Sequence, residues 1–230
     1  MTGLVFLHGW GYGPQTWDSL VAALRPAPVI VLDAGYFGPP DLPSSLPERL
    51  KDILPANPDG WLGVGHSLGF ARLLQMDVSW RGLVGIGGFL RFCQKSGQST
   101  GTSTDMLDAM LARLDTAPQD VLARFHKRCG HRVTPLPLPS AASLERLRAD
   151  LELLRDLDLS PDLARPRRPV PTLLLHAQDD RIVPTALAEE AQALLPGSRL
   201  TLLTTGGHAL PMTRPHDCQR LVREFLHDLS

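Results

Sequence analysis

Residues 65–69 read Gly-His-Ser-Leu-Gly, and this pentapeptide restricts the fold more than any other part of the sequence. It follows an apolar run at residues 61–64 and precedes a helical stretch at residues 68–76. We therefore predict a sharp turn between a buried strand and a helix, because glycines on both sides let the two elements approach closely. Such a turn pushes the side chain of Ser67 into the open.

Short apolar runs alternate with amphipathic stretches over most of the chain. Runs of about four apolar residues are typical of strands that are buried on both faces of a parallel sheet. The alternation predicts the fold class α/β, with a mainly parallel sheet of about six strands and helices on both faces. We predict strands at residues 4–7, 29–32, 61–64, 83–86, 172–175 and 200–203, and helices at 14–24, 46–54, 68–76, 185–195 and 215–229.

Residues 89–168 interrupt this alternation. They contain no convincing buried strand, but they show helical patterns at 105–114, 119–129 and 141–154. We predict a core formed by residues 1–88 and 169–230. The helical segment 89–168 is expected to be inserted in that core as a lid over the active site.

Composition excludes several classes of protein. A net charge of −1 over 230 residues gives no general attraction to nucleic acid or to membrane surfaces. No apolar run approaches the ~18 residues of a membrane span, and we see no signal peptide. The cysteines, Cys93, Cys129 and Cys218, are odd in number and scattered. This pattern favours free thiols in a reducing compartment, so we expect a cytoplasmic protein.

A serine hydroxyl needs an adjacent base, and the base needs a carboxylate that orients it. His208 lies in a glycine-rich loop after the last predicted strand, and Asp180 follows the fifth predicted strand, three residues before Val183. We predict Ser67 as nucleophile, His208 as base and Asp180 as acid. Asp179 competes for the role of acid, but we interpret it as a loop or capping carboxylate.

Two backbone amides are expected to stabilise the developing oxyanion. One belongs to Leu68, after the nucleophile, and the other to Trp10, in the loop after the first strand. We predict no cofactor and no metal site, because no ligand cluster surrounds His8 and the glycines at 9–13 lack the lysine of a phosphate-binding loop. We assign no catalytic role to His66. The remaining histidines are interpreted as surface or loop residues, namely His126, His131, His176, His216 and His227.

Four motifs together resemble the α/β-hydrolase superfamily, namely residues 7–11, 65–69, 180–184 and 207–209. Residues 8–11, 105–125, 136–139 and 150–159 are similar to the pimeloyl-[acyl-carrier protein] methyl ester carboxylesterases of biotin synthesis. The chain departs from that family in two ways. The family usually has two strands before the His-Gly motif at residues 8–9, and we expect this chain to lack them and to form about six strands. His66 stands where the family often has tryptophan.

This resemblance implies an α/β-hydrolase fold and a specific reaction. Ser67 would cleave a methyl ester at the far end of an acyl chain carried by acyl carrier protein. Trp10, Leu68 and lid residues would line the acyl pocket, with Phe125 the best match to a family contact. The implied partner is an acyl carrier protein that binds transiently.

The predicted lid is basic. Residues 121–148 contain one acidic residue, Glu145, and six basic ones, which gives a local charge of +5. Because acyl carrier proteins are acidic, this charge could steer them to the site. The competing interpretation is an ordinary solvated helix face. The candidate docking residues are Arg124, Lys127, Arg128, Arg132, Arg146 and Arg148.

Two further interpretations remain open. A general short-chain esterase, a thioesterase or a lyase would keep the same fold with a different substrate, since the lid sets that choice. A non-catalytic binding protein of this fold is the other, and the intact set of Ser67, Asp180 and His208 argues against it.

Overall fold

A computed structural model of the chain contains one sheet of six strands in the order β2-β1-β3-β4-β5-β6. Each neighbouring pair of strands is parallel, as the alternation of elements predicted. The structure describes residues 1–38, 54–95, 97, 100–131, 138–160 and 169–229. The strands are β1 (Gly3–Leu7), β2 (Val29–Leu32), β3 (Trp61–His66), β4 (Trp80–Ile86), β5 (Thr172–Ala177) and β6 (Arg199–Leu203).

Helices cover both faces of this sheet because side chains alternate along each strand. In β1, Leu4 and Phe6 pack into one apolar layer, and Val5 and Leu7 pack into the other. The first layer is closed by the helices η1 (Pro14–Trp17), α1 (Asp18–Leu24), α9 (Leu210–Thr213) and α10 (Pro215–Asp228). The second is closed by α3 (Leu68–Gln75) and α8 (Thr185–Leu194).

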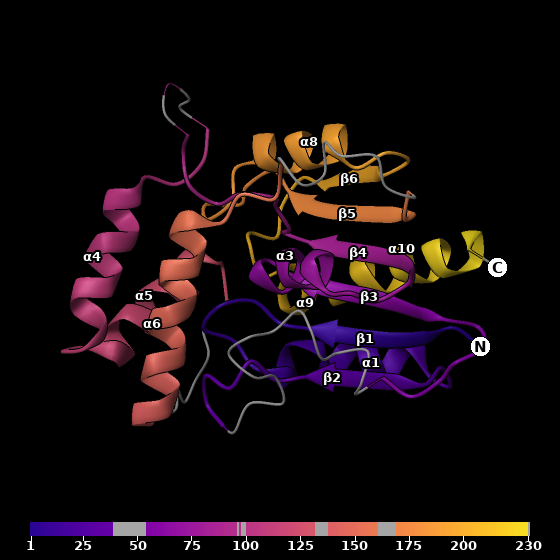
Figure 1. Cartoon of the computed structure of the whole chain (residues 1–230), viewed down its shortest axis with the longest axis horizontal. Helices are drawn as coiled ribbons and strands as arrows, with labels where there is room; N and C mark the ends of the chain where they lie inside the picture. Colours follow the sequence, from indigo (N-terminus) through magenta and orange to yellow (C-terminus); the bar gives the residue numbers. More distant parts are fainter. Residues whose placement is uncertain (39–53, 96, 98–99, 132–137, 161–168, 230) are drawn as a thin grey trace.

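Three more helices lie between β4 and β5 in the sequence. They are α4 (Thr104–Leu114), α5 (Pro118–Arg128) and α6 (Ala141–Asp156), and they match the helical patterns in the sequence to within two residues. Figure 1 shows them gathered beyond the carboxyl ends of the strands, whereas both chain termini lie at the opposite end of the sheet. Active sites of parallel α/β sheets form at these carboxyl ends.

Boundaries differ from the sequence prediction by two or three residues at three strands. β3 continues through His66 rather than ending at residue 64. β4 begins at Trp80 rather than at residue 83, and β5 continues through Ala177 rather than ending at residue 175. The helix predicted at residues 46–54 lies almost wholly outside the described residues. Among the residues that are described, no helix is long and apolar enough to cross a membrane.

Candidate active site

Ser67 occupies a turn with strained backbone between β3 and α3. Its φ of 54° and ψ of −123° lie in a region that residues with side chains rarely adopt. A Cβ atom on Gly65 would lie 2.3 Å from Cα of Phe70, and one on Gly69 would lie 2.1 Å from the carbonyl oxygen of Leu7. Both positions therefore require glycine, as the pentapeptide predicted, and the crossing of strand and helix fixes the place of the serine.

His208 and Asp180 form a buried pair. Nδ1 of His208 lies 2.7 Å from Oδ2 of Asp180, and both side chains are almost completely inaccessible to solvent. The other ring nitrogen, Nε2, has no hydrogen-bond partner among the described residues. The carboxylate fixes the ring through Nδ1–H, so Nε2 is the nitrogen that can accept a proton.

The second oxygen of Asp180 is held by the chain itself. Oδ1 accepts hydrogen bonds from the amides of Ile182 at 2.8 Å and Val183 at 2.9 Å. Burial alone would raise the pKa of Asp180, but the charge and hydrogen bond of His208 and further polar contacts hold the pKa below its ordinary value. Asp180 is therefore ionised when it faces His208. Asp179 instead accepts the amide of Gly207 at 2.8 Å through Oδ1, and so supports the histidine loop.

His66 connects the serine turn with the histidine loop. Its ring lies 4.9 Å from the ring of His208, and its Nε2 lies 3.0 Å from the carbonyl oxygen of His208. Because His66 precedes Ser67 in the chain, this contact brings the serine turn and the pair formed by His208 and Asp180 into one site.

The loop after β1 lies against the same turn. A Cβ atom on Gly9 would approach Cβ of Ser67 to 2.9 Å. His8 holds this loop through Nε2, which lies 3.2 Å from Oδ1 of Asp33 and 3.1 Å from the amide of Ala34. The backbone amides of Trp10 and Leu68 donate no hydrogen bond to any group within the described part of the chain. Leu68 is the first residue of α3, where backbone amides lack helical partners.

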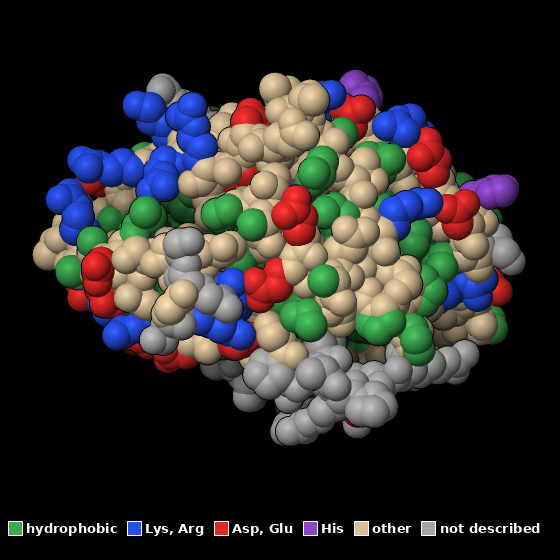
Figure 2. Space-filling model, turned by 90° about the horizontal axis from the view of Figure 1, so that it is seen from above, with side chains coloured by type: hydrophobic (Ala, Val, Ile, Leu, Met, Phe, Trp, Pro, Cys, Tyr) green, Lys and Arg blue, Asp and Glu red, His purple; other side chains and the backbone are tan. Residues whose placement is uncertain are grey.

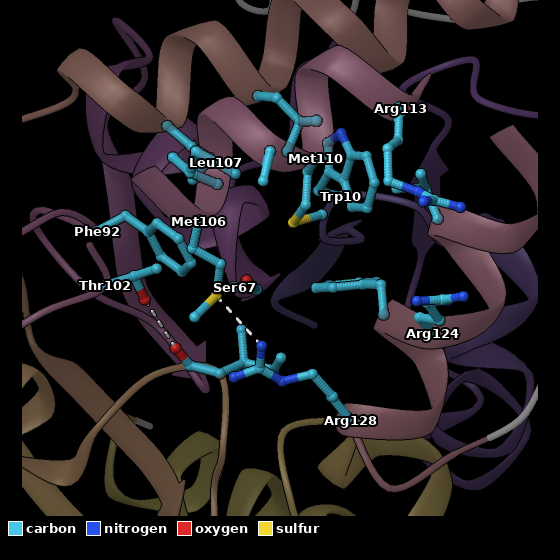
Figure 3. Close-up of a pocket in the computed structure, with 16 residues that line it drawn as sticks. Trp10, Ser67, Phe92, Thr102, Met106, Leu107, Met110, Arg113, Arg124 and Arg128 are labelled. Carbon is cyan, nitrogen blue, oxygen red and sulfur yellow. Dashed lines mark hydrogen bonds between the residues drawn. The ribbon is translucent and has the colours of Figure 1, made fainter. Parts of the chain in front are cut away.

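A cavity of about 270 Å³ opens at Ser67, with lining residues that come mostly from α4, α5 and α6. Trp10 and Phe125, expected as pocket residues, both line it and meet edge to face at 4.9 Å. Leu68 is buried and is not among the lining residues. In Figure 3, Arg113, Arg124 and Arg128 lie along one side of this apolar pocket, and Phe92 and Leu107 lie on the other.

Basic side chains gather at the end of the molecule that carries α4, α5 and α6 (Figure 2). Arg124, Lys127 and Arg128 are exposed on α5, and Arg146 and Arg148 are partly buried on α6. Two acidic residues lie just before the segment 121–148 whose charge was counted. Asp120 pairs with Arg124, and Asp115 pairs with Arg148. Arg132 lies outside the described residues. Arg113 is a pocket residue that the sequence analysis missed.

Two histidines predicted to lie at the surface or in loops are buried, so that prediction was wrong for them. His126 is 1% exposed on α5, and His176 is 0% exposed in β5. Their positions carried a signal. His126 follows buried Leu122 by four residues, which places both on one helix face. His176 precedes apolar Ala177, which extends the strand past the predicted end. His216 and His227 are exposed, as predicted.

Comparisons with known proteins identify the family. A model of the α/β-hydrolase family matches residues 4–220. A pimeloyl-[acyl-carrier protein] methyl ester esterase of Aromatoleum aromaticum is 31% identical over 247 aligned residues, which cover 97% of this chain and 97% of that protein. An esterase of the same name from Xylella fastidiosa is 28% identical, with 98% of this chain and 95% of that one covered. Among solved structures, an esterase from Exiguobacterium antarcticum superimposes with a TM-score of 0.81 at 19% identity, over 99% of this chain and 92% of that one. The chain belongs to the α/β-hydrolase family.

Proposed function

We propose that this chain hydrolyses the methyl ester of pimeloyl-acyl carrier protein in biotin synthesis, giving the carrier-bound free acid and methanol. The family match and the similarity to esterases indicate that the chain is a carboxylic ester hydrolase. The observation that carries the finer proposal is the nearly full-length similarity to relatives that are named for this reaction. An apolar pocket with a serine in its lining and arginines on one side suits an acyl chain that a charged carrier delivers.

Each polar group of the site has a role in the proposed mechanism. Oγ of Ser67 attacks the ester carbonyl carbon while its proton passes to Nε2 of His208. Asp180 holds His208 in the required tautomer and stabilises the imidazolium. The amides of Leu68 and Trp10 bind the oxyanion of the tetrahedral intermediate.

The intermediate then collapses. The bond between the carbonyl carbon and the methoxy oxygen breaks, and the departing methoxy group takes the proton from His208 and leaves as methanol. A water molecule, deprotonated by the same histidine, attacks the acyl-enzyme. Ser67 regains its proton, and the free carboxylic acid is released on its carrier.

We assign the acyl chain to the pocket beneath α4, α5 and α6. Phe92, Met110, Leu151 and Leu154 supply an apolar wall that suits a run of methylene groups. In this proposal Leu68 contributes its amide, and its side chain packs in the core. The helical segment 89–168 acts as the lid, and residues 1–88 and 169–230 form the catalytic core.

We assign the carrier protein to the basic end of the lid. Among the described residues, Lys127 and Arg128 form no ion pair with a carboxylate, so their charges are available to an acidic partner. Exposed charges of this kind increase the association rate more than the affinity, and salt weakens the effect. Arg124, Arg146 and Arg148 complete the proposed surface among the described residues, and Arg132 belongs to the same proposal.

The deciding experiment measures demethylation of methyl pimeloyl-acyl carrier protein by mass spectrometry, beside hydrolysis of short p-nitrophenyl esters. Ser67→Ala serves as the blank. We expect Ser67-dependent demethylation with a much higher kcat/KM than that for the small esters. If only the small esters were hydrolysed, the chain would still be an esterase, but the proposal of a carrier-bound substrate would be rejected. Cleavage of the thioester instead would reassign the chain as a thioesterase.

Charge reversal tests the docking surface separately. We expect Arg124→Glu combined with Arg128→Glu to lower kcat/KM for the carrier-bound ester about tenfold more than for a small ester at low salt. The difference should shrink at high salt. Arg220→Glu combined with Arg223→Glu on α10 is the matched control, because it makes the same change in charge and also breaks a surface ion pair. Equal losses in both double variants would reject the docking surface.

A further inference from the structure

Three buried histidines make the same contact at three different loops of the site. Nε2 of His66 lies 3.0 Å from the carbonyl oxygen of His208. Nε2 of His126 lies 2.7 Å from the carbonyl oxygen of Gly11, and Nε2 of His176 lies 2.8 Å from that of Val183. In all three rings, Nδ1 is buried with no hydrogen-bond partner among the described residues.

The protonation of these rings follows from their partners. A carbonyl oxygen only accepts hydrogen bonds, so each Nε2 must carry a proton and donate it. Burial lowers the pKa of His66 to about 3. Burial also lowers the pKa of His126 and of His176 below the ordinary value. All three rings are therefore neutral near pH 7, with the proton on Nε2 and a bare Nδ1.

Each accepting carbonyl belongs to a loop with a different task in the proposed mechanism. The first is that of His208, the proposed base. The second is the carbonyl of Gly11, the residue after Trp10, whose amide is proposed to bind the oxyanion. The third, that of Val183, belongs to the residue whose amide binds Oδ1 of Asp180. The three donors come from different elements, since His66 ends β3, His126 lies on α5 and His176 lies in β5.

The histidine loop depends on such anchors because its backbone is unusual. Gly206 and Gly207 adopt φ values of 142° and 63°, which leave this stretch of backbone outside regular structure. The hydrogen bond from His66 fixes the carbonyl of His208 itself. A ring that shifts by about 1 Å loses a large part of its catalytic effect.

We propose that His66, His126 and His176 are positioning residues that act as neutral Nε2–H donors, each fixing one loop of the catalytic site through its main-chain carbonyl. The inference rests on the proposed serine mechanism but not on the identity of the ester. His66, to which the sequence analysis gave no role, thereby sets the orientation of the base. Tryptophan at this position would place an indole against the histidine loop instead.

Paired substitutions test the proposal. Glutamine places an amide nitrogen near the position of Nε2 and keeps the donor, whereas leucine removes the donor at similar size. Each histidine is changed to glutamine and to leucine, and His216→Leu on the exposed face of α10 is the control. The first readout is the rate at which a small fluorophosphonate labels Ser67, which needs an activated serine but no acyl pocket. The others are kcat and KM for p-nitrophenyl acetate and the melting temperature.

For each histidine we expect the leucine variant to be labelled about tenfold more slowly, with kcat lowered and KM little changed, since one hydrogen bond of about 1.4 kcal/mol corresponds to a factor of ten. The glutamine variant should recover most of the rate. Labelling of folded leucine variants at the wild-type rate overturns the inference. So do glutamine variants as slow as their leucine partners at an unchanged melting temperature. A wild-type protein that is not labelled at Ser67 overturns the proposed mechanism itself.

Discussion

Substitution of Asp180 by asparagine tests which carboxylate serves the proposed base. Two backbone amides, those of Ile182 and Val183, point at Oδ1 of Asp180, and Nδ1–H of His208 points at Oδ2. Asparagine keeps only one acceptor oxygen. Nε2 of His176 lies 3.5 Å from Oδ2 but donates to the carbonyl oxygen of Val183 at 2.8 Å. Because the two amides at Oδ1 are both at hydrogen-bond distance and His208 can accept at Nδ1, we expect the asparagine oxygen on the Oδ1 side and its NH2 group facing His208.

An NH2 group in front of Nδ1 favours the imidazole tautomer that carries its proton on Nε2. That tautomer cannot accept the proton of Ser67. The corresponding change in a Ser-His-Asp site costs about 10⁴-fold in kcat. We therefore expect Asp180→Asn to lower kcat by about 10³- to 10⁴-fold, which corresponds to ~4–5.5 kcal/mol of transition-state stabilisation. KM should change little, because the carboxylate does not line the acyl pocket.

Asp179→Asn is the matched control in the neighbouring residue. Its Oδ1 accepts only the amide of Gly207 among the described donors, and an asparagine oxygen accepts that bond equally well. We expect a loss of less than about threefold. Both variants are assayed with p-nitrophenyl acetate, and their melting temperatures are recorded. A larger loss for Asp179→Asn than for Asp180→Asn would refute both the assignment of the acid and the reasoning about the amides.

Two further expectations follow from the packing and from the buried histidines. Gly69→Ala would place Cβ 2.1 Å from a main-chain oxygen of β1. The serine turn must then move, and we expect a loss of about 1–3 kcal/mol in unfolding free energy and about 10² in kcat. Gly38→Ala, whose Cβ would meet no described residue closer than Asp33 at 3.8 Å, should change stability and kcat little. Acid should destabilise the fold, because burial lowers the pKa of His66 from 6.5 to about 3, so only the unfolded chain takes up the proton between these values. The contribution of a neutral, buried His66 to the free energy of unfolding is fully present above pH 6.5. It falls by about 1.4 kcal/mol per pH unit as the pH decreases toward 3. Urea unfolding at pH 7 and pH 5 measures this loss, and His66→Gln should reduce it; an equal loss in that variant would contradict the assignment.

Local sequence signals accounted for most of the fold. Apolar runs located all six strands, because a parallel sheet buries its strands on both sides and leaves continuous runs. Helical spacing located the longer helices on both faces, but not the four-residue helix α9. The start of β4 was the least visible boundary. Trp80 belongs to that strand through its register with Trp61, and pairing between two strands of the sheet leaves no local signal in the sequence.

The candidate site was predictable to a different degree. The order of Ser67, Asp180 and His208 in the sequence indicated the three side chains, and the structure places two of them in direct contact. The assignment of their roles stays a prediction. The buried state of His126 and His176 was missed although each position carried a local signal, because a histidine is compatible both with a solvent-exposed surface and with a hydrogen-bonded interior position. Its partner decides between them, and both partners are main-chain carbonyls that no side-chain pattern reveals.

Helix α5 supports two parts of the site through its buried face. Nε2 of His126 reaches the carbonyl oxygen of Gly11 in the loop after β1. At the end of the same helix, the carbonyl oxygen of Cys129 accepts the amide of Ala209, the residue after the proposed base. A small rotation of α5 would therefore disturb the loop after β1 and the loop that carries His208 together.

The exposed face of α5 is separate from these contacts. Arg124 and Arg128 are four residues apart and share the exposed face. Leu122 and His126 are also four residues apart and share the buried face. The two pairs differ by two positions, which corresponds to about 200° around the helix. Charge reversal at the arginines removes no hydrogen bond of the buried face, but it changes two residues that line the pocket and removes the hydrogen bond from Arg128 to the carbonyl oxygen of Arg181. If such variants also labelled Ser67 slowly with a fluorophosphonate, the cause would be a displaced helix, and the loss with the carrier-bound ester would then carry no evidence for docking.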